Sequence, residues 1–589
     1  MSVFSYILRR STLIVPLVYV LLLLLFQPFT WIDNTCTAAA SVWGEPSPHL
    51  IYVGYLLSYP MMWGRILFPQ IEWFTAIQYL LYLVSITVLA HYTLRHQWQR
   101  PGIKHIAGFA LILYLTVLLF KRFYFPYVSC VGMASGLLLM LYGSKRGKLS
   151  RIVWGCLLLL AGASLRYDSS PLVLLVAGIL LNLYAIKKRW HQLGCILLAC
   201  ACGAGVYLLQ PLLATVSTWE VSACHPAQNL IEINDARMRF CDYRDDSDME
   251  KASAYEQLNC SKNDLMQLER FDTCLPQRSD SKWWKSMLDL RNRANDKYPR
   301  TLKLMWKRIR FWYSQRILTP VMYTLLPLLL LCFPFPRRWD DERIWLFTAY
   351  LAAILTLIVI GRVNTTSVIA ILYLILPLML FEMPDRPFKH RASLNVSLVL
   401  LCIILTLSVR SLIIPQAVYE WRAGSRFSPL SANYWNPSLT HRIREECARH
   451  PDRQYFMPVH LWWRGCMPSS SLLSQSYLEW RNVFPMYCWT YLLPSIHQEL
   501  HRRGVKSDLT LFFNPNYRYI INTADSFWTT YYESISPHSL LFYIEHYGVQ
   551  PKMIPELSLG ENWWICRIEC SNVMEKGPEP MGDTHENAR

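Results

Sequence analysis

The sequence lacks the short motifs by which soluble enzymes hold nucleotides or activate a nucleophile. It has no P-loop, no GxSxG turn, no HExxH helix and no glycine-rich dinucleotide fingerprint. Charged residues are also scarce, at 17% of the chain, whereas hydrophobic residues make up 53%. These absences argue against nucleotide chemistry by a familiar soluble motif, and the apolar excess indicates a membrane protein.

Long apolar runs with almost no charge recur along the chain. Runs such as STLIVPLVYVLLLLLFQPF and VSLVLLCIILTLSVRSLII have the length of about 20 residues that crosses roughly 30 Å of hydrocarbon. The first run is not followed by a small-residue cleavage site, so we expect it to remain as a helix. We predict an α-helical polytopic protein with about eleven transmembrane helices, near 12–28, 72–92, 106–121, 127–143, 152–166, 171–186, 193–213, 317–335, 344–361, 365–382 and 396–413.

Basic residues gather in short clusters between these runs, and the clusters give the predicted topology. They lie at 9–10, 95–104, 145–151, 187–189, 337–343 and 386–391. Such clusters mark cytoplasmic loops, so the net charge of +17 reflects topology and does not call for a nucleic-acid partner. All six fall on one side if residues 48–68 do not cross the membrane. We then expect a cytoplasmic N-terminus and an extracytoplasmic C-terminus.

The segment EPSPHLIYVGYLLSYPMMWGRILFPQIEW, residues 45–73, is apolar but is interrupted by Pro60. Ser47 and Pro48 are suited to the start of a helix, and the tyrosines and Trp63 favour the headgroup region of a bilayer. We predict a helix that lies at the outer membrane surface or dips into the membrane and returns to the same side. The alternative is a twelfth span with a proline kink.

Three segments are predicted on the outer side of a transmembrane domain that covers residues 1–413. They are a first loop at 29–71, a large loop at 214–316, and a C-terminal domain at 415–570 with a disordered tail at 571–589. The large loop ends in PRTLKLMWKRIRFWYSQR, which has the pattern of a second surface helix, and its four cysteines suit disulfides. The C-terminal segment mixes helical pieces with strand-like ones, which predicts a small α/β domain; the strand-like pieces are RQYFMPV, TLFFNP, YRYIIN and WWICRIE.

The acidic run RDDSDME in the large loop has two readings. Asp245, Asp246 and Asp248 look like the motif by which many soluble glycosyltransferases hold a metal and a nucleotide sugar. Nucleotide sugars are cytoplasmic and this loop is predicted to be outside, which favours a solvated acidic turn. A divalent cation would also need further oxygen ligands, and the sequence shows no such set. We therefore predict no metal site and leave a divalent-cation cofactor open.

The order of these parts resembles the membrane glycosyltransferases of the GT-C fold. The shared features are an early Asp and a surface helix in the first outer loop, many spans, a second surface helix and a terminal outer domain. GEPSPHLIYVGYLL with IEWFTAIQYLL, GASLRYDSSPLVLL and EINDARMRFCDYRDD also resemble segments of uncharacterised bacterial multi-span membrane proteins. The resemblance implies a bacterial inner membrane, a sugar donor carried on a polyprenyl phosphate, and an acidic residue of the first loop as general base.

On this resemblance the base is Asp33 in FTWIDNTC, with Glu45 as the reserve candidate. Position alone fits a solvated helix-end acid equally well, and Asn34 stands where many such enzymes have a second acid. A departing lipid phosphate calls for cations. The candidates are Arg65, Arg166, Arg362 and the cluster of Lys307, Arg308 and Arg310. For Arg166 the structural alternative is an ion pair with Asp168.

We therefore expect an integral membrane glycosyltransferase of cell-envelope glycan or polysaccharide assembly, whose partners are membrane lipid, a polyprenyl-phosphate sugar and a glycan acceptor. A polysaccharide repeat-unit polymerase, a lipid or glycan transporter and a non-catalytic membrane scaffold are the alternatives. A transporter would line a midplane path with charge, whereas the charged candidates lie at the outer rim of the predicted spans.

Overall fold

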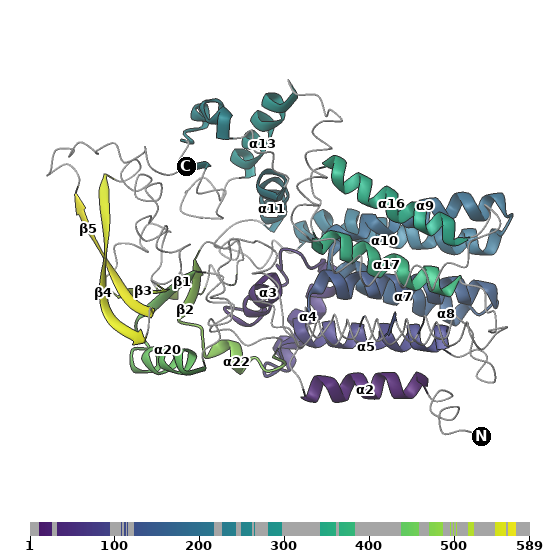
Figure 1. Cartoon of the computed structure of the whole chain (residues 1–589), viewed down its shortest axis with the longest axis horizontal. Helices are drawn as coiled ribbons and strands as arrows, with labels where there is room; N and C mark the ends of the chain where they lie inside the picture. The colour runs from purple at the N-terminus through teal and green to yellow at the C-terminus, as the bar shows by residue number, and fades with distance from the viewer. Residues whose placement is uncertain are drawn as a thin grey trace, which may run out of the picture.

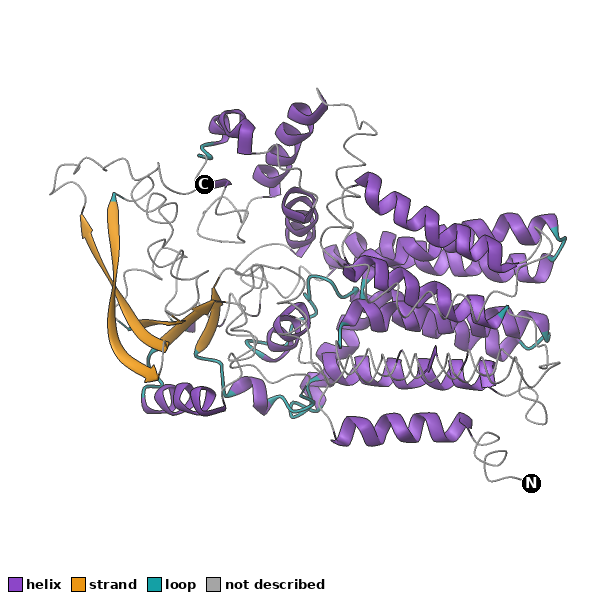
Figure 2. Ribbon diagram, in the orientation of Figure 1, coloured by secondary structure: helices purple, strands orange, loops and turns teal. Residues whose placement is uncertain are grey.

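The structure is a computed structural model of the whole chain, and its described part is mostly helical with one small sheet (Figures 1 and 2). The described residues are 11–25, 32–94, 123–216, 227–242, 249–261, 281–296, 342–360, 365–382, 437–458, 471–486, 516–522, 548–560 and 563–572, with 108, 111, 112, 115, 264, 265, 495, 499, 502 and 503.

A bundle of long apolar helices forms one half of the molecule (Figure 1). Its helices are α2 (Ser11–Leu25), α5 (Trp73–Leu94), α7 (Phe125–Lys145), α8 (Leu149–Leu165), α9 (Ser170–Ile186), α10 (Trp190–Val216), α16 (Glu342–Ile360) and α17 (Thr365–Phe381). Within the described ranges, five segments are long and apolar enough to cross a membrane: Trp73–Tyr92, Phe125–Lys145, Tyr167–Ile186, Trp190–Ala214 and Glu342–Val359. These segments support the prediction of a membrane protein.

Most of the predicted spans coincide with helices of the bundle. The matching predictions are those near 12–28, 72–92, 127–143, 152–166, 171–186, 193–213, 344–361 and 365–382. The predicted spans near 317–335 and 396–413, and nearly all of 106–121, lie outside the described residues. The total of eleven spans therefore stays a prediction.

Helices α7 and α8 pack closely because glycines lie at their contact. A Cβ atom added to Gly136 would lie 2.6 Å from the Leu159 backbone nitrogen and 2.7 Å from the Gly155 carbonyl oxygen. Across the same contact the Ser129 hydroxyl donates to the Gly162 carbonyl oxygen over 2.7 Å. In lipid, close backbone packing and such hydrogen bonds replace the hydrophobic effect as the force between helices.

The two ends of the bundle differ in charge. At one end Lys145, the last residue of α7, pairs with Glu382 over 2.8 Å, while Lys187 and Arg189, after α9, pair with Glu342 over 3.0 and 2.7 Å. These contacts bring two of the predicted cytoplasmic clusters to one end, which is also the end at which α2 begins (Figure 1). The sheet and the helices of the first loop lie at the opposite end (Figure 1).

The first loop folds into two short helices at this opposite end, α3 (Ile32–Val42) and α4 (Tyr55–Leu67). Helix α4 has 13 residues, with Pro60 inside it, and would span about 20 Å at 1.5 Å per residue. This is less than the roughly 30 Å of a hydrocarbon core. The length therefore fits the predicted surface helix better than a twelfth span.

The large loop contributes a small helical module with its own core. It consists of α11 (Ala227–Asp242), the 3₁₀ helix η3 (Met249–Leu258) and α13 (Ser281–Asp296). Phe240, Tyr255, Trp283 and Trp284 pack together at its centre. Asp245, Asp246, Asp248 and the predicted surface helix at 299–316 lie outside the described residues. Of the four cysteines in this loop only the Cys260 side chain is described, so the disulfides stay a prediction.

The C-terminal segment contains a small sheet and helices, in line with the predicted α/β character, while the predicted strand-like piece TLFFNP at 510–515 lies outside the described residues. Its strands are β1 (Gln454–Pro458), β2 (Val483–Met486), β3 (Tyr517–Asn522), β4 (Val549–Gly560) and β5 (Trp563–Asn572), in the order β2-β1-β3-β5-β4. Strand β1 runs parallel to β2 and β3, whereas β5 is antiparallel to β3 and β4. Helices α20 (Pro437–Arg449) and α22 (Gln475–Leu478) complete the described part of this unit. Strand β5 continues to Asn572, past the predicted start of the tail.

The close packing of α7 against α8 can be tested by adding one methyl group at position 136. Gly136→Ala should lower the melting temperature of the detergent-purified protein, because overpacking of this kind costs about 1–3 kcal/mol. The matched control is Gly178→Ala in α9, where a Cβ atom meets nothing within 4 Å. We expect the control to melt at or above the wild-type temperature, since alanine favours helix over glycine. Equal melting temperatures for the two variants would contradict this packing.

Candidate functional site

Asp33 lies in the first turn of α3, at the end of the bundle that carries the sheet. Its side chain is partly exposed. Its carboxylate accepts a hydrogen bond of 2.6 Å from the hydroxyl of Tyr124, the residue directly before α7. The positive end of the helix dipole favours an acid at this position. Asp33 therefore lies at the rim of the bundle, as predicted, and has a specific phenol partner.

Asn34, the residue after Asp33, holds α3 against the bundle. Its side-chain oxygen accepts from the Phe125 backbone N–H over 2.8 Å, and its nitrogen donates to Gln78 over 3.1 Å. Asn34 is only 2% exposed. A carboxylate at this position could not donate to Gln78. The amide thus fixes α3 against α5 and α7 and sets the approach of Tyr124 to Asp33.

Arg166 and Asp168 form a bidentate ion pair in the turn between α8 and α9. The Nε and Nη2 atoms of Arg166 donate to the two carboxylate oxygens over 2.6 and 3.0 Å. The guanidinium also lies 5.5 Å from the ring centre of Phe125 and 5.8 Å from that of Tyr52. The structural alternative predicted for Arg166 is therefore observed, and a phosphate-binding role stays a prediction.

The charges of both Asp33 and Arg166 act on the phenol of Tyr124, so these three residues belong to one site. Burial raises the pKa of the Tyr124 phenol well above its usual value, the charge of Asp33 raises that pKa further, and the charge of Arg166 lowers it. Tyr124 therefore stays protonated near neutral pH and acts as a donor to the Asp33 carboxylate. Local sequence gave no signal for this residue, because it is 91 positions from Asp33.

Arg237 brings the large loop to the same site. It projects from α11, is only 6% exposed, and its Nη2 donates to Asn234 over 3.0 Å and to the Tyr52 hydroxyl over 3.4 Å. Tyr52 is the ring that also faces Arg166. Two guanidinium groups from distant segments thus converge on one tyrosine of the first loop. The sequence analysis did not predict a role for Arg237.

Arg65 and Glu45 lie away from Asp33, near the other end of α3. Arg65 donates to the carbonyl oxygens of Ser41 over 2.9 Å and of Gly44 over 2.6 Å, and so caps the C-terminal end of α3. Glu45 is exposed. Burial lowers the pKa of Arg65, and the charge of Glu45 opposes that shift. Ser41 is eight residues from Asp33 along α3, a rise of about 12 Å, so the two predicted groups of residues are separate.

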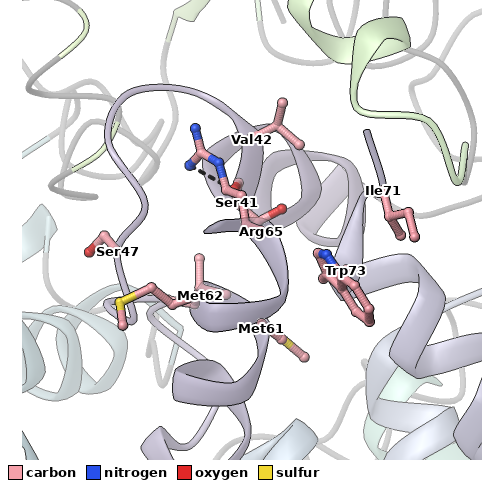
Figure 3. Close-up of a pocket in the computed structure, with 9 residues that line it drawn as sticks. Ser41, Val42, Ser47, Met61, Met62, Arg65, Ile71 and Trp73 are labelled. Carbon is pink, nitrogen blue, oxygen red and sulfur yellow. Dashed lines mark hydrogen bonds between the residues drawn. The ribbon is translucent and has the colours of Figure 1, made fainter. Parts of the chain in front are cut away.

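A small pocket lies beside Arg65 (Figure 3). In Figure 3 the guanidinium is turned toward the end of α3, where it bonds to Ser41. Most of the wall is apolar; the lining residues are Ser41, Val42, Ser47, Leu50, Met61, Met62, Arg65, Ile71 and Trp73. The phosphate role predicted for Arg65 would compete with its bonds to the α3 carbonyls.

The remaining predicted cations, Arg308, Arg310 and Arg362, lie outside the described residues. Their predicted roles therefore stay predictions. Within the described ranges, no group of three or more His, Cys, Asp or Glu side chains is placed to hold a metal ion.

Compared with known proteins, the chain matches no protein-family model, no curated sequence and no solved structure. Among the described residues, the cluster of Asp33, Tyr124 and Arg166 is the candidate site for a chemical reaction. This cluster combines a carboxylate, a phenol and a guanidinium at one end of a membrane bundle.

His49 is a buried neutral base in the same loop. It is 2% exposed, and its Nδ1 makes a hydrogen bond of 2.9 Å with the Tyr55 hydroxyl. Burial lowers the pKa of His49 to about 4, far below the usual value near 6.5. The fold thus requires the uncharged imidazole.

This requirement predicts a loss of stability in acid. Between pH 6.5 and about 4 the unfolded chain binds a proton at His49 that the folded chain does not, so unfolding becomes easier as the pH falls, by at most about 1.4 kcal/mol per pH unit. His49→Gln should flatten that part of the melting temperature plotted against pH. His441→Gln, at an exposed position on α20, should keep the wild-type slope. An unchanged slope in His49→Gln would contradict the assignment.

Proposed function

We propose that the protein is an integral membrane glycosyltransferase that moves a sugar from a polyprenyl phosphate to a glycan acceptor in cell-envelope glycan or polysaccharide assembly. The observation that carries the proposal is the Asp33 carboxylate, held by Tyr124 in the first turn of α3 and electrostatically linked through it to Arg166. This is the loop in which GT-C enzymes keep their base, and the carboxylate is partly exposed.

The residues at this site fit the parts that such a transfer needs. A carboxylate can take the proton of an acceptor hydroxyl as that oxygen attacks the sugar. The hydroxyl of Tyr124 donates to one Asp33 oxygen and so helps to orient the carboxylate. The departing lipid phosphate carries negative charge, which the guanidinium groups of Arg166 and Arg237 would stabilise. The leaving group is the polyprenyl phosphate of the donor, so the transfer requires no nucleotide-binding motif.

The proposed topology places this site on the extracytoplasmic face of a bacterial inner membrane. It has about eleven spans, a cytoplasmic N-terminus and an extracytoplasmic C-terminal domain. Two basic turns, at 145–151 and 187–189, lie at the end of the bundle opposite Asp33. Cytoplasmic loops carry such an excess of Lys and Arg. This charge asymmetry supports an outward-facing site.

A transporter fits the described part of the bundle less well. A transport path needs polar or charged groups near the membrane midplane. In the described spans the charged side chains lie near the helix ends, as with Lys145 and Glu342. The charged cluster around Asp33 also lies at an end of the bundle, which suits chemistry at a membrane surface.

The role of Asp33 is tested by the isosteric variant Asp33→Asn. If Asp33 is the base, glycan extension in cells should fall by about 100-fold or more, because general-base catalysis contributes on that scale. The control is Glu445→Gln, at an exposed position of α20, which should leave extension unchanged. Both variants are compared at equal protein level in the membrane. Undiminished product from Asp33→Asn would rule out this role.

The lipid-linked glycan that accumulates in a deletion strain separates the transferase from the polymerase. A transferase should leave a defined truncated glycan on the lipid, measurable by its mass. A single complete repeat unit would instead identify a polymerase, and an unchanged glycan profile would favour the scaffold alternative.

A further inference from the structure

Helix α4 presents a wholly apolar face to its surroundings. Leu56, Pro60, Trp63 and Leu67 recur at helical spacing and are all exposed, whereas Met61 on the other face is buried. The chain continues this surface past the end of the helix with Phe68, which is 55% exposed. The Phe68 ring lies 6.3 Å from the ring of Trp73, the first residue of α5, and on α5 itself Leu80 is 60% exposed.

The C-terminal unit adds two leucines to this surface. Leu472 and Leu473 precede α22 and are 44% and 60% exposed. A short antiparallel bridge joins this segment to the residues before α5 and pairs Leu473 with Ile71. The Glu72 N–H donates to the Leu472 carbonyl, and the Ser474 N–H donates to the Gln70 carbonyl, each over 2.9 Å.

The bridge fixes where the Leu473 side chain lies. The two hydrogen bonds flank the pair of Ile71 and Leu473 instead of joining it, so these side chains stand close together on the same side. Ile71 is two residues before Trp73, the first residue of a membrane-spanning candidate. If α5 crosses the membrane, Leu473 is therefore held at the depth at which that span enters the bilayer.

We propose that Leu472 and Leu473 insert into the bilayer beside Phe68, so that the C-terminal unit binds lipid directly. Lipid is the occupant that this surface fits, because Leu473 pairs with Ile71 directly before the candidate span and the Phe68 ring lies 6.3 Å from the ring of Trp73, the first residue of that span. Exposed Trp and Phe side chains beside a span are typical of the membrane interface. The next turn of the chain carries exposed Gln475 and Glu479, which suit the aqueous side of that boundary.

This contact would hold the C-terminal unit against the membrane next to the first loop. The inference does not depend on the glycosyltransferase proposal, since it uses neither Asp33 nor any substrate. It depends on α5 crossing the bilayer, and the experiment below contains a separate control for that step.

The test places a small environment-sensitive fluorescent amino acid at position 473 of the full-length protein, by stop-codon suppression, in lipid nanodiscs. Phospholipids brominated on their acyl chains quench a fluorophore that contacts the hydrocarbon. We expect clear quenching at 473 relative to unbrominated lipid. Position 80, on the exposed face of α5, is the positive control, and Lys552, exposed on β4, is the negative control. A probe at 472 repeats the measurement if the 473 variant is poorly folded.

Any of three results would overturn the proposal while position 80 is quenched. Red-shifted, unquenched emission at 473 would place the leucine in water. Blue-shifted emission without quenching would mean that protein, and not lipid, covers it. Quenching at 473 equal to the small value at 552 would likewise place the C-terminal unit away from the bilayer.

Discussion

The joint between the bundle and the C-terminal unit is built around the buried carboxylate of Glu72. This carboxylate is fully buried, and its oxygens accept from the Ser41 hydroxyl over 2.7 Å and from the backbone N–H groups of Phe74 and Thr75 over 2.9 and 2.8 Å. Burial raises the pKa of Glu72, and these hydrogen bonds oppose that shift. The carboxylate joins α3 to the start of α5, and the backbone N–H of the same residue joins them to Leu472 of the C-terminal unit.

The position of Asp33 follows from this joint, because α3 is held at both ends. Asn34 fastens its first turn to α5 and α7, while Glu72 holds Ser41 in its last turn. The C-terminal unit adds a third fixed point beyond the helix, where the Trp43 indole donates to the Tyr477 carbonyl over 3.1 Å. A reactive group is aligned best on a rigid element supported by its neighbours, and α3 meets that requirement. The membrane bundle and the outer unit thus share the task of positioning one short helix.

Local sequence patterns predicted the helices and several strands, but they did not predict contacts between residues that are far apart in the chain. Apolar runs of about 20 residues predicted the described spans, and strands β1, β3 and β5 were recognised from their composition. Strands β2 and β4 were not predicted; they carry Pro485, Pro551 and Pro555, and proline is unfavourable inside a central strand. Both are edge strands of the sheet, where proline is tolerated. The pairing of Arg166 with Asp168 was accessible from a spacing of two residues, whereas the contact from Tyr124 to Asp33 requires the tertiary structure.

The location of the candidate site follows from the cost of charge inside a bilayer. Ionised side chains are expensive within the hydrocarbon, so a bundle of this kind keeps them at its ends. One end carries basic turns that are joined by ion pairs to Glu342 and Glu382, which suits anchoring and orientation. The other end gathers Asp33, Tyr124 and Arg166 from segments that spans separate along the chain. Only the packed bundle brings these three groups together, so bundle packing and any chemistry at this end should be lost together.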